Sequence, residues 1–403
     1  MKTNRYLLGL ALLVVGTMPA FSQVSNDNED EVYKIDARAG YNDYVPGQVL
    51  VKFKDANRVQ INRTRGIVSS TNVTKLTDVL RKYGVNEMEQ LLPQENPNRQ
   101  LSKTRAYNGE TIQEKDLSQL YQVKLSAEHV FEVKPMIEEL NALDQVEFAE
   151  PNYKLYTLAE SIVSSYDDNP MVSEQWYLDN YGLKELWTKP IINTTRPVIA
   201  ILDTGVDITH PDLVDNIWTK PGTENEHGYD FINETTDIRD NNLHGTHVAG
   251  IAAACNNETG IVGANPQALI MPITVLQSDG VGDVATIIKG IDYAISNGAT
   301  VLNMSLGTYA NSSALRQALE KAYQKAVLVA AAGNDNMRIH LALSGSCADP
   351  KHKCEYGKMF PAAYSFVLGV QAITSTGELA SFSNHDNDGN TFSSELTAMD
   401  PEG

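Results

Sequence analysis

An aspartate, a histidine and an asparagine stand at positions in the sequence where side chains could act together in acid–base catalysis. Asp203 comes directly after the apolar run of residues 198–202. His244 opens a segment rich in small residues, and Asn334 follows a further apolar run. A buried carboxylate can hold an imidazole in one tautomer and stabilise its cation, which leaves the second ring nitrogen free to act as a general base. An asparagine amide can donate to an oxyanion that develops at a carbonyl group. The three residues are therefore candidates for one catalytic site.

The apolar runs alternate with amphipathic segments, and these are the elements that must position the three side chains. Strands are expected at residues 198–202, 268–276, 299–304, 327–332 and 366–372. Helices are expected at residues 244–255, after a cap at Asp283 and after Ser312. The alternation predicts an α/β fold, in which a parallel sheet carries helices on both faces. Because ligands bind beyond the carboxyl ends of the strands in such sheets, the residues just after each apolar run are the ones expected at the site.

Residues 46–155 carry a different pattern and predict a small α+β domain ahead of the parallel sheet. Strands are expected at residues 48–54, 85–92, 119–125 and 145–149. One helix is expected from Thr74, which can cap it, and another around Pro135, which suits a first turn. The resulting order is βαββαβ, a split βαβ sandwich. Residues 93–116 are polar and are interpreted as an insertion.

Composition and the N-terminal residues limit the classes of function. The chain has 403 residues, with 32 Lys and Arg against 51 Asp and Glu, and its formal net charge of −19 argues against a nucleic-acid partner. Lys2 and Arg5 precede an apolar run that ends in small residues, which predicts a signal peptide at residues 1–22 and a protein that is secreted or held in the cell envelope. Neither this run nor any later one is long enough to be expected to span a membrane. Residues 23–45 are expected to be a loose polar segment, and residues 156–170 an exposed linker.

Three motifs in chain order resemble those of the subtilisin-like serine peptidases, the subtilases. They are Ile201-Leu202-Asp203-Thr204-Gly205-Val206, His244-Gly245-Thr246-His247-Val248-Ala249-Gly250 and Ala331-Ala332-Gly333-Asn334. Subtilisins place the Asp before the His along the chain. The resemblance makes residues 171–403 an incomplete catalytic domain. Residues 46–155 resemble the inhibitory propeptide of the family, above all at 45–53 and 150–153. The resemblance implies a secreted serine endopeptidase that is made as a zymogen and matures by cleavage in the linker.

The resemblance implies a role for each matching residue. Asp203 orients the base, His244 is the base, and Asn334 is the side-chain donor of the oxyanion hole. Two segments line the cleft and hold an extended peptide as an added strand. Their residues are Gly280 and Gly282 on one rim, and Ser305, Leu306 and Gly307 on the other. The implied partners are protein or peptide substrates and the chain's own propeptide, which acts as an intramolecular inhibitor.

A structural calcium site is also implied by the resemblance. Its ligands would be three side-chain oxygens and three backbone carbonyls, from Gln175, Asp212 and Asn257 and from Cys255, Thr259 and Ile261 respectively. All-oxygen ligation that includes several carbonyls suits calcium. The alternative interpretation of this loop is a solvated, Asn-rich turn.

One departure from the family pattern concerns the nucleophile. The family carries it in a Gly-Thr-Ser-Met-Ala motif, which this sequence lacks. The match continues through residues 380–384 and reaches residues 401–403, so the nucleophile is expected a little beyond the last residue. Ser393 and Ser394 lie in a polar stretch without the flanking glycine and are weak candidates. Two explanations stay open: a truncated form of an active peptidase, which the abrupt stop favours, or a genuine product that lacks the nucleophile. The chain as given is expected to be inactive alone.

Other classes of function stay open as well. A catalytically dead pseudo-protease would bind extended peptides without cutting them, and the missing serine is its support. A metal hydrolase would use His244 and His247, but no His-Glu-x-x-His motif and no obvious third ligand accompany them. Export also bears on the cysteines: Cys347 and Cys354 can close a disulfide loop or remain thiols, whereas Cys255 is expected to be a buried small hydrophobe.

Overall fold

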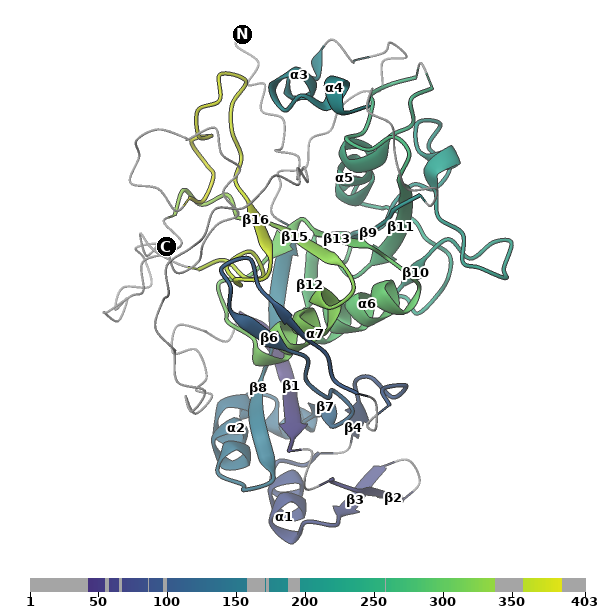
Figure 1. The fold of residues 1–403 in the computed structure, drawn as a ribbon. Helices are drawn as coiled ribbons and strands as arrows, with labels where there is room; N and C mark the ends of the chain where they lie inside the picture. The colour runs from purple at the N-terminus through teal and green to yellow at the C-terminus, as the bar shows by residue number, and fades with distance from the viewer. Residues whose placement is uncertain are drawn as a thin grey trace.

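The structure is a computed structural model, and two blocks of chain account for the residues that it describes (Figure 1). These residues are 43–54, 58–64, 67–85, 87–96, 100–157, 171, 174–187, 196–257, 259–337 and 358–385. The first block is residues 43–157, and the second is residues 171–385. The expected signal peptide, most of the linker, Cys347, Cys354, Ser393 and Ser394 lie outside the described residues.

The first block is an antiparallel sheet with two helices on it. Its sheet has the order β8-β1-β7-β4. The elements are β1 (Tyr44–Phe53), β2 (Ile61–Thr64), β3 (Ile67–Thr71), α1 (Thr74–Lys82), β4 (Glu87–Gln90), β5 (Lys103–Arg105), β6 (Thr111–Gln113), β7 (Leu120–Lys124), the 3₁₀ turn Ala127–His129, α2 (Val133–Asn141) and β8 (Val146–Thr157). When the two short hairpins β2–β3 and β5–β6 are set aside, the order is βαββαβ, as the pattern predicts.

Three features of this block differ from the prediction. The polar insertion contains the β5–β6 hairpin. The last strand, β8, is twelve residues long and continues through Thr157, into the expected linker. Thr74 is the first residue of α1 and not its cap, because the N-cap position falls on Val73 and no side chain caps the helix. Thr77 instead accepts a hydrogen bond from the backbone N–H of Thr71 at 2.8 Å, which ties α1 to the hairpin before it.

The second block contains a parallel sheet with the order β10-β11-β9-β13-β15-β16. Its elements are α3 (Tyr177–Asn180), α4 (Leu183–Trp187), β9 (Val198–Asp203), the 3₁₀ turn Val214–Asn216, β10 (Tyr229–Asp230), α5 (His244–Ala253), β11 (Leu269–Thr274), β12 (Val281–Asp283), α6 (Val284–Ser296), β13 (Val301–Met304), β14 (Leu306–Gly307), α7 (Ser313–Tyr323), β15 (Val327–Ala331) and β16 (Leu368–Val370). Each neighbouring pair in this sheet is parallel.

Helices cover both faces of this sheet, because successive side chains of a strand point to opposite sides. On β9, Ala200 and Leu202 belong to the large core that contains α6 and α7, whereas Ile201 belongs to a second core that contains Val248 of α5. Figure 1 accordingly shows α5 on one side of the strands and α6 with α7 on the other. The predicted α/β fold with helices on both faces is confirmed.

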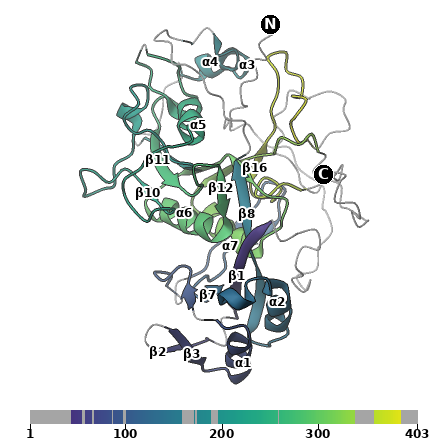
Figure 2. The same cartoon turned by 180° about the vertical axis from the view of Figure 1, so that it is seen from behind.

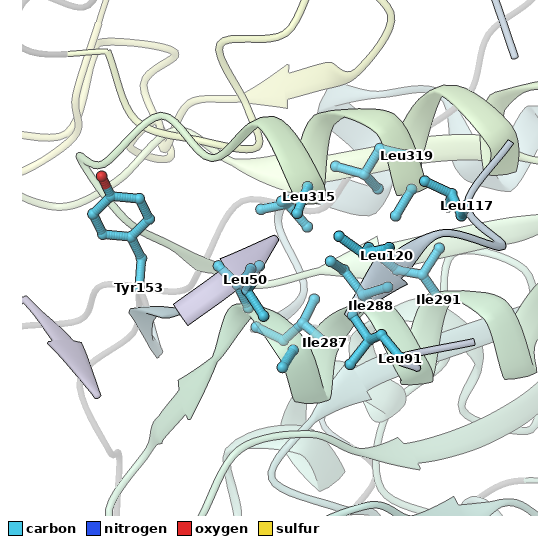
Figure 3. Packing of buried hydrophobic residues seen from close by; sticks show 14 of the residues in the cluster. Leu50, Leu91, Leu117, Leu120, Tyr153, Ile287, Ile288, Ile291, Leu315 and Leu319 are labelled. Atoms are coloured by element: carbon cyan, nitrogen blue, oxygen red, sulfur yellow. The ribbon is translucent and has the colours of Figure 1, made fainter. Parts of the chain in front are cut away.

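Two of the predicted helix starts are confirmed by their caps. The Asp283 side chain accepts from the backbone N–H of Thr286, and that of Ser312 accepts from Leu315. The two capped helices, α6 and α7, pack against the first block. Their apolar side chains interleave with those of the first block in one continuous core (Figure 3), which includes Leu50, Leu91, Leu117 and Leu120 together with Ile287, Ile288, Ile291, Leu315 and Leu319.

Strand β8 joins the two blocks through its backbone. Its first half pairs antiparallel with β1 of the first block. Its last residues pair antiparallel with β12 and β14 of the second block. Figure 2 shows β8 running out of the first block and up beside β12. Among the described residues, no helix has the length and apolar character needed to cross a membrane.

Candidate active site

Asp203 and His244 meet at the carboxyl end of β9. Asp203 is the last residue of that strand and is fully buried, and His244 is the first residue of α5. The Nδ1 atom of His244 lies 2.6 Å from Oδ1 of Asp203. The same carboxylate oxygen also accepts from the backbone N–H of Thr204 at 2.7 Å. The carboxylate is thus anchored by its own backbone turn while it holds the imidazole.

A glycine lets α5 approach this strand end closely. A Cβ atom at Gly245 would collide with the backbone carbonyl oxygen of Gly205 and would press on the Cβ of Asp203. Gly205 itself has a φ of +117°, a conformation that side chains other than glycine rarely adopt. These two glycines set the distance between helix and strand, and therefore the contact between His244 and Asp203.

A second carboxylate, Asp240, organises the loop that leads into α5. Its Oδ1 accepts from the Thr204 hydroxyl and from two backbone N–H groups of the loop. Its Oδ2 accepts from the backbone N–H of Thr246 at 2.8 Å and from the hydroxyl of Thr246 at 2.6 Å. Asp240 therefore satisfies donors in the first turn of α5. The sequence prediction missed this residue, although an Asp in an Asn-rich loop just before a helix is a turn and capping signal.

Two buried atoms of the pair have no hydrogen-bond partner among the described residues: Nε2 of His244 and Oδ2 of Asp203. Burial lowers the pKa of His244, but the hydrogen bond and charge of Asp203, helped by the charge of Asp240, outweigh it and raise the pKa above its ordinary value. An imidazole whose Nδ1 is held and whose Nε2 is unpartnered is arranged to accept a proton at Nε2.

Asn334 follows β15 at the same edge of the sheet. Strand β15 pairs in parallel with β13, and β13 pairs in parallel with β9, so the ends of all three strands lie on one side. Gly333 adopts a φ of +109°, and a Cβ there would collide with the side-chain amide of Asn384. The sequence places Asn334 directly after this glycine, at the start of the loop that leaves the sheet.

The loop that carries Asn334 is held by Asn384, which the sequence prediction did not single out. Asn384 is fully buried. Its Oδ1 accepts from the backbone N–H groups of Asp335 and Met337, and its Nδ2 donates to the carbonyl of Ala332. Each of these contacts joins residues about 50 positions apart in the sequence, so no local sequence pattern predicts them.

The predicted rims of the cleft lie on either side of one strand. Gly282 is opposite Leu155 of β8, and Gly307 is opposite Tyr156. Gly280 lies in the turn before β12, where its N–H donates to the carbonyl of Gln277. Leu306 begins β14 opposite Thr157, and Ser305 directly precedes it and accepts from the side chain of Asn303. The structure thus brings all five residues to the end of β8, whose Leu155 is fully buried there.

The residues expected to bind calcium gather around Asp212. This carboxylate is buried, its Oδ2 accepts from the N–H of Ile261, and its Oδ1 has no partner among the described residues. Cys255 donates its N–H to the backbone carbonyl of Asp212, and the side-chain Oε1 of Gln175 accepts from the backbone N–H of Val262. Asn257 closes a turn onto Thr259. A buried carboxylate oxygen without a donor, beside a loop that is rich in carbonyls, fits a calcium ion. As expected, Cys255 is buried.

The second histidine of α5 occupies a different environment. Burial, together with the nearby charge of His244, lowers the pKa of His247. Within the described part of the chain, no group of three or more His, Cys, Asp or Glu side chains is positioned to hold a metal ion. These observations give the metal-hydrolase alternative no third ligand among the described residues.

Comparison with known proteins identifies the family. Residues 194–399 match the model of the subtilase family, peptidase S8. The chain is 37% identical over 268 residues to a thermophilic serine proteinase of Bacillus sp. (strain AK1), and the match covers 65% of this chain and 58% of that protein. It is 32% identical over 309 residues to subtilisin amylosacchariticus of Bacillus subtilis subsp. amylosacchariticus, and this match covers 73% of each.

A solved structure shares the fold. It is fervidolysin from Fervidobacterium pennivorans, a keratinolytic enzyme related to subtilisin, with a TM-score of 0.54 and 22% sequence identity. The match covers 86% of this chain and 46% of that one. This match supports the fold. The family model over residues 194–399 and the similarity to subtilisin amylosacchariticus confirm the family that the three motifs predict: the chain belongs to the subtilase family.

Proposed function

We propose that this protein is a secreted serine endopeptidase made as a zymogen, with Asp203, His244 and Asn334 in its catalytic site. The observation that carries the proposal is the geometry of His244. Its Nδ1 lies 2.6 Å from a fully buried carboxylate, while its buried Nε2 has no partner among the described residues. That is the arrangement a general base needs when it is to take a proton from a serine hydroxyl.

The proposed reaction has two halves. A serine hydroxyl attacks the carbonyl carbon of the scissile peptide bond, and its proton passes to Nε2 of His244. The Asn334 amide donates to the resulting oxyanion, while Asp203 stabilises the imidazolium. When the C–N bond breaks, the imidazolium gives its proton to the leaving amine, and water then hydrolyses the acyl-enzyme by the same steps. Because the family's Gly-Thr-Ser motif is absent from these 403 residues, we assign the nucleophile to none of them and expect them to be inactive alone.

The first block is proposed to be the inhibitory propeptide. Its strand β8 ends between β12 and β14, whose residues are the proposed edges of the substrate cleft. The side chains of its residues Glu150 and Asn152 also accept hydrogen bonds from backbone N–H groups in the first turns of α7 and α6, respectively. A strand that lies in the cleft blocks a peptide from pairing with the same edges. Maturation would therefore require cleavage after β8, within the proposed linker.

A calcium ion is proposed to stabilise the second block. Gln175, Asp212 and Asn257 would supply side-chain oxygens, and Cys255, Thr259 and Ile261 would supply carbonyls. Calcium bound only by the folded state raises the melting temperature. We expect added calcium to raise the Tm of the wild type, measured against an EDTA control, and to leave the Tm of an Asp212→Asn variant unchanged. An equal rise in both proteins would contradict the assignment of this site.

Activity of the full gene product tests the main proposal. The natural gene, including whatever follows the codon of Gly403, is expressed with its signal peptide, and the medium is assayed for hydrolysis of a chromogenic peptide. We expect hydrolysis that a serine-directed sulfonyl fluoride inhibits. His244→Ala should reduce it by roughly a factor of 10⁴ or more, the size of the effect when a member of such a triad is removed. His247→Ala is the matched control, since the proposal gives this residue no part in the reaction.

A pseudo-protease is the second candidate, and the absence of the Gly-Thr-Ser motif is the observation that favours it. In that case the folded, secreted gene product would bind a fluorescent extended peptide without cutting it. Binding without hydrolysis would replace the peptidase proposal, whereas hydrolysis that depends on His244 would exclude the pseudo-protease.

A further inference from the structure

The β5–β6 hairpin leaves the sheet of the first block and lies against α7 of the second block (Figure 1). Glu110, in the connection between its two strands, makes the central contact. One carboxylate oxygen accepts from the hydroxyl of Ser365 at 2.6 Å, and the other lies 3.3 Å from the guanidinium of Arg316. These partners lie more than 200 positions away in the sequence. The polar segment that looks like an insertion is therefore a contact between blocks.

Aromatic packing adds to this contact. The rings of Tyr107 and Tyr323 meet edge to face, with centroids 5.6 Å apart. The hydroxyl of Tyr323 donates to the backbone carbonyl of Arg105 at 3.0 Å. Ala106 and Ile112 of the hairpin are buried. The hairpin thus docks through one aromatic pair, one ion pair and two hydrogen bonds, in addition to its buried apolar side chains.

The surface that receives the hairpin is held in place by its own block. The Arg316 guanidinium is fixed by Glu320 on the next turn of α7 and lies over the rings of Tyr364 and Phe366. A side chain that is already fixed loses little entropy when Glu110 docks on it. The receiving surface is therefore preorganised.

A second ion pair lies on the same helix. Lys321 of α7 is nearly buried and contacts both Asp292 of its own block and Glu95 of the first block. We use the name hairpin anchor for Glu95 together with residues Lys103–Gln113. The hairpin anchor contacts α7 and Ser365, whereas β8 pairs with β12 and β14. The hairpin anchor is consequently an attachment of the first block that is separate from the pairing of β8 and adds to the apolar core that both blocks share.

We propose that the hairpin anchor is a further docking site that, together with the shared apolar core, keeps the first block bound to α7 when the end of β8 leaves the cleft. This proposal rests on the proposed role of the first block as an inhibitor. A block that stays attached at the hairpin anchor keeps β8 at high effective concentration beside the cleft, so β8 returns before a substrate can compete. Full release of the inhibitor then requires the hairpin anchor to open.

Hydrogen exchange of the full chain tests this, with mass spectrometry resolving the peptides. The backbone N–H groups of Ser313 and Ala314 report on the attachment, because both donate to Glu150 of the first block. Glu110→Ala should speed exchange in the first turn of α7 by about fivefold, which corresponds to the loss of one hydrogen bond. Ser365→Ala, in the second block, should speed the same exchange by a similar factor. In the double variant the increase in exchange rate should be smaller than the product of the two single increases, because both substitutions remove one contact. Glu89→Ala, on the exposed side of β4, is the control and should change nothing.

The location of the faster exchange distinguishes an anchor of the whole block from a local contact of the hairpin. Faster exchange in α7 and in β12 and β14 supports an anchor that holds the whole block. Faster exchange confined to residues 103–113 overturns the proposal, because the hairpin would then be a local attachment that the block does not need. Exchange does not depend on peptide hydrolysis, so a gene product without peptidase activity would refute the proposed function and leave this test intact.

Discussion

Two carboxylates raise the pKa of His244 against the opposing effect of burial. Asp203 acts through a hydrogen bond and its charge, and Asp240 acts through its charge alone. Asp240 also fixes the loop before α5, so it serves the site in two ways. The ionisation of His244 is therefore the most direct experimental measure of the site, and it needs no substrate.

Asp203→Asn should lower the pKa of His244. The substitution removes the largest favourable charge and leaves the burial, which disfavours the cation. The pKa is read from the NMR chemical shifts of the imidazole as the pH is varied. Asp237→Asn is the matched control, because that exposed carboxylate pairs with Arg239 and does not contact the site. An unchanged pKa in Asp203→Asn would show that the carboxylate does not set the charge on His244.

The contact between Asp203 and His244 also makes the stability of the fold depend on pH. A histidine whose pKa is higher in the folded state than in the unfolded state stabilises the fold fully below its unfolded pKa. The contribution is lost as the pH rises through the higher folded value. The free energy of unfolding should therefore fall across this interval in the wild type and stay flatter in Asp203→Asn.

Sequence reasoning could find Asp203, His244 and Asn334, because each follows an apolar strand or opens a helix. It could not find Asn384, whose role depends on contacts with a loop about 50 residues earlier. Asp240 is a mixed case: its place just before α5 is a local capping signal that could have been used, whereas its contact with Thr204 spans 36 positions and leaves no local pattern. The proposed catalytic residues leave a local pattern, whereas Asn384 positions its loop through contacts that form only in the fold.

At the level of elements, the site depends on how closely α5 approaches the end of β9. Gly245 and Gly250 both lie on this helix, but only Gly245 faces a backbone carbonyl, that of Gly205. A Cβ at Gly250 would meet a single side-chain carbon, the Cδ1 of Ile261, at 3.5 Å, which is ordinary contact. The helix therefore contains a sensitive position and a tolerant one.

Gly245→Ala should destabilise the fold by about 3 kcal/mol, because a methyl group pressed against backbone forces the helix away. It should also lower the pKa of His244, since His244 and Asp203 would separate. Gly250→Ala should stabilise the protein by up to about 1 kcal/mol through helix propensity. Urea unfolding and the NMR titration measure both effects. Equal effects of the two substitutions would contradict the close approach at Gly245.

A buried carboxyl connects β8 to α7. Burial raises the pKa of Glu150 to about 7, although hydrogen bonds from Ser312, Ala314 and Ser313 work in the opposite direction. The folded protein therefore keeps this proton at pH values where the unfolded chain has lost it. The free energy of unfolding therefore falls as the pH rises from about 4.5 to about 7, and the contribution of this proton is lost completely above that range.

Glu150→Gln removes this titration. The free energy of unfolding of the wild type minus that of the variant should fall as the pH rises through that range, by roughly 3 kcal/mol at most. Urea unfolding at a series of pH values measures the difference, and other titrating groups cancel between the two proteins. Glu128→Gln, at an exposed position, should leave the pH profile unchanged. A constant difference would show that the Glu150 carboxyl titrates in its ordinary range.

Most elements were predictable because burial leaves an apolar pattern in the sequence, either a continuous run or a helical stripe. Strand β9 and helix α6 are examples, and the caps of α6 and α7 fix where those helices begin. The β5–β6 hairpin was not predictable. Its polar residues are explained by Arg316, Tyr323 and Ser365, which lie in another block. The length of β8 was missed for the same reason, since β12 and β14 supply the partners of its last residues.

Over the whole molecule, the two blocks share one apolar core. Leu120 is fully buried in the first block and belongs to the same cluster as Ile288 and Leu319 of the second. Figure 3 shows these side chains meeting between β7, α6 and α7. A shared core couples the stabilities of the blocks, so a cavity on one side should weaken the other.

Leu120→Ala tests this coupling with a probe in the other block. All three tryptophans, Trp176, Trp187 and Trp218, belong to the second block, so their fluorescence during urea unfolding reports on that block alone. Removing a buried leucine side chain costs about 2–5 kcal/mol. If the core is shared, the urea midpoint followed by tryptophan fluorescence should fall, although the substitution lies in the first block. Phe131→Ala is the control: Phe131 is 67% exposed and should leave the midpoint in place. A tryptophan midpoint that Leu120→Ala does not move would mean that the second block holds its fold without the first, and that the contact between them adds nothing to its stability.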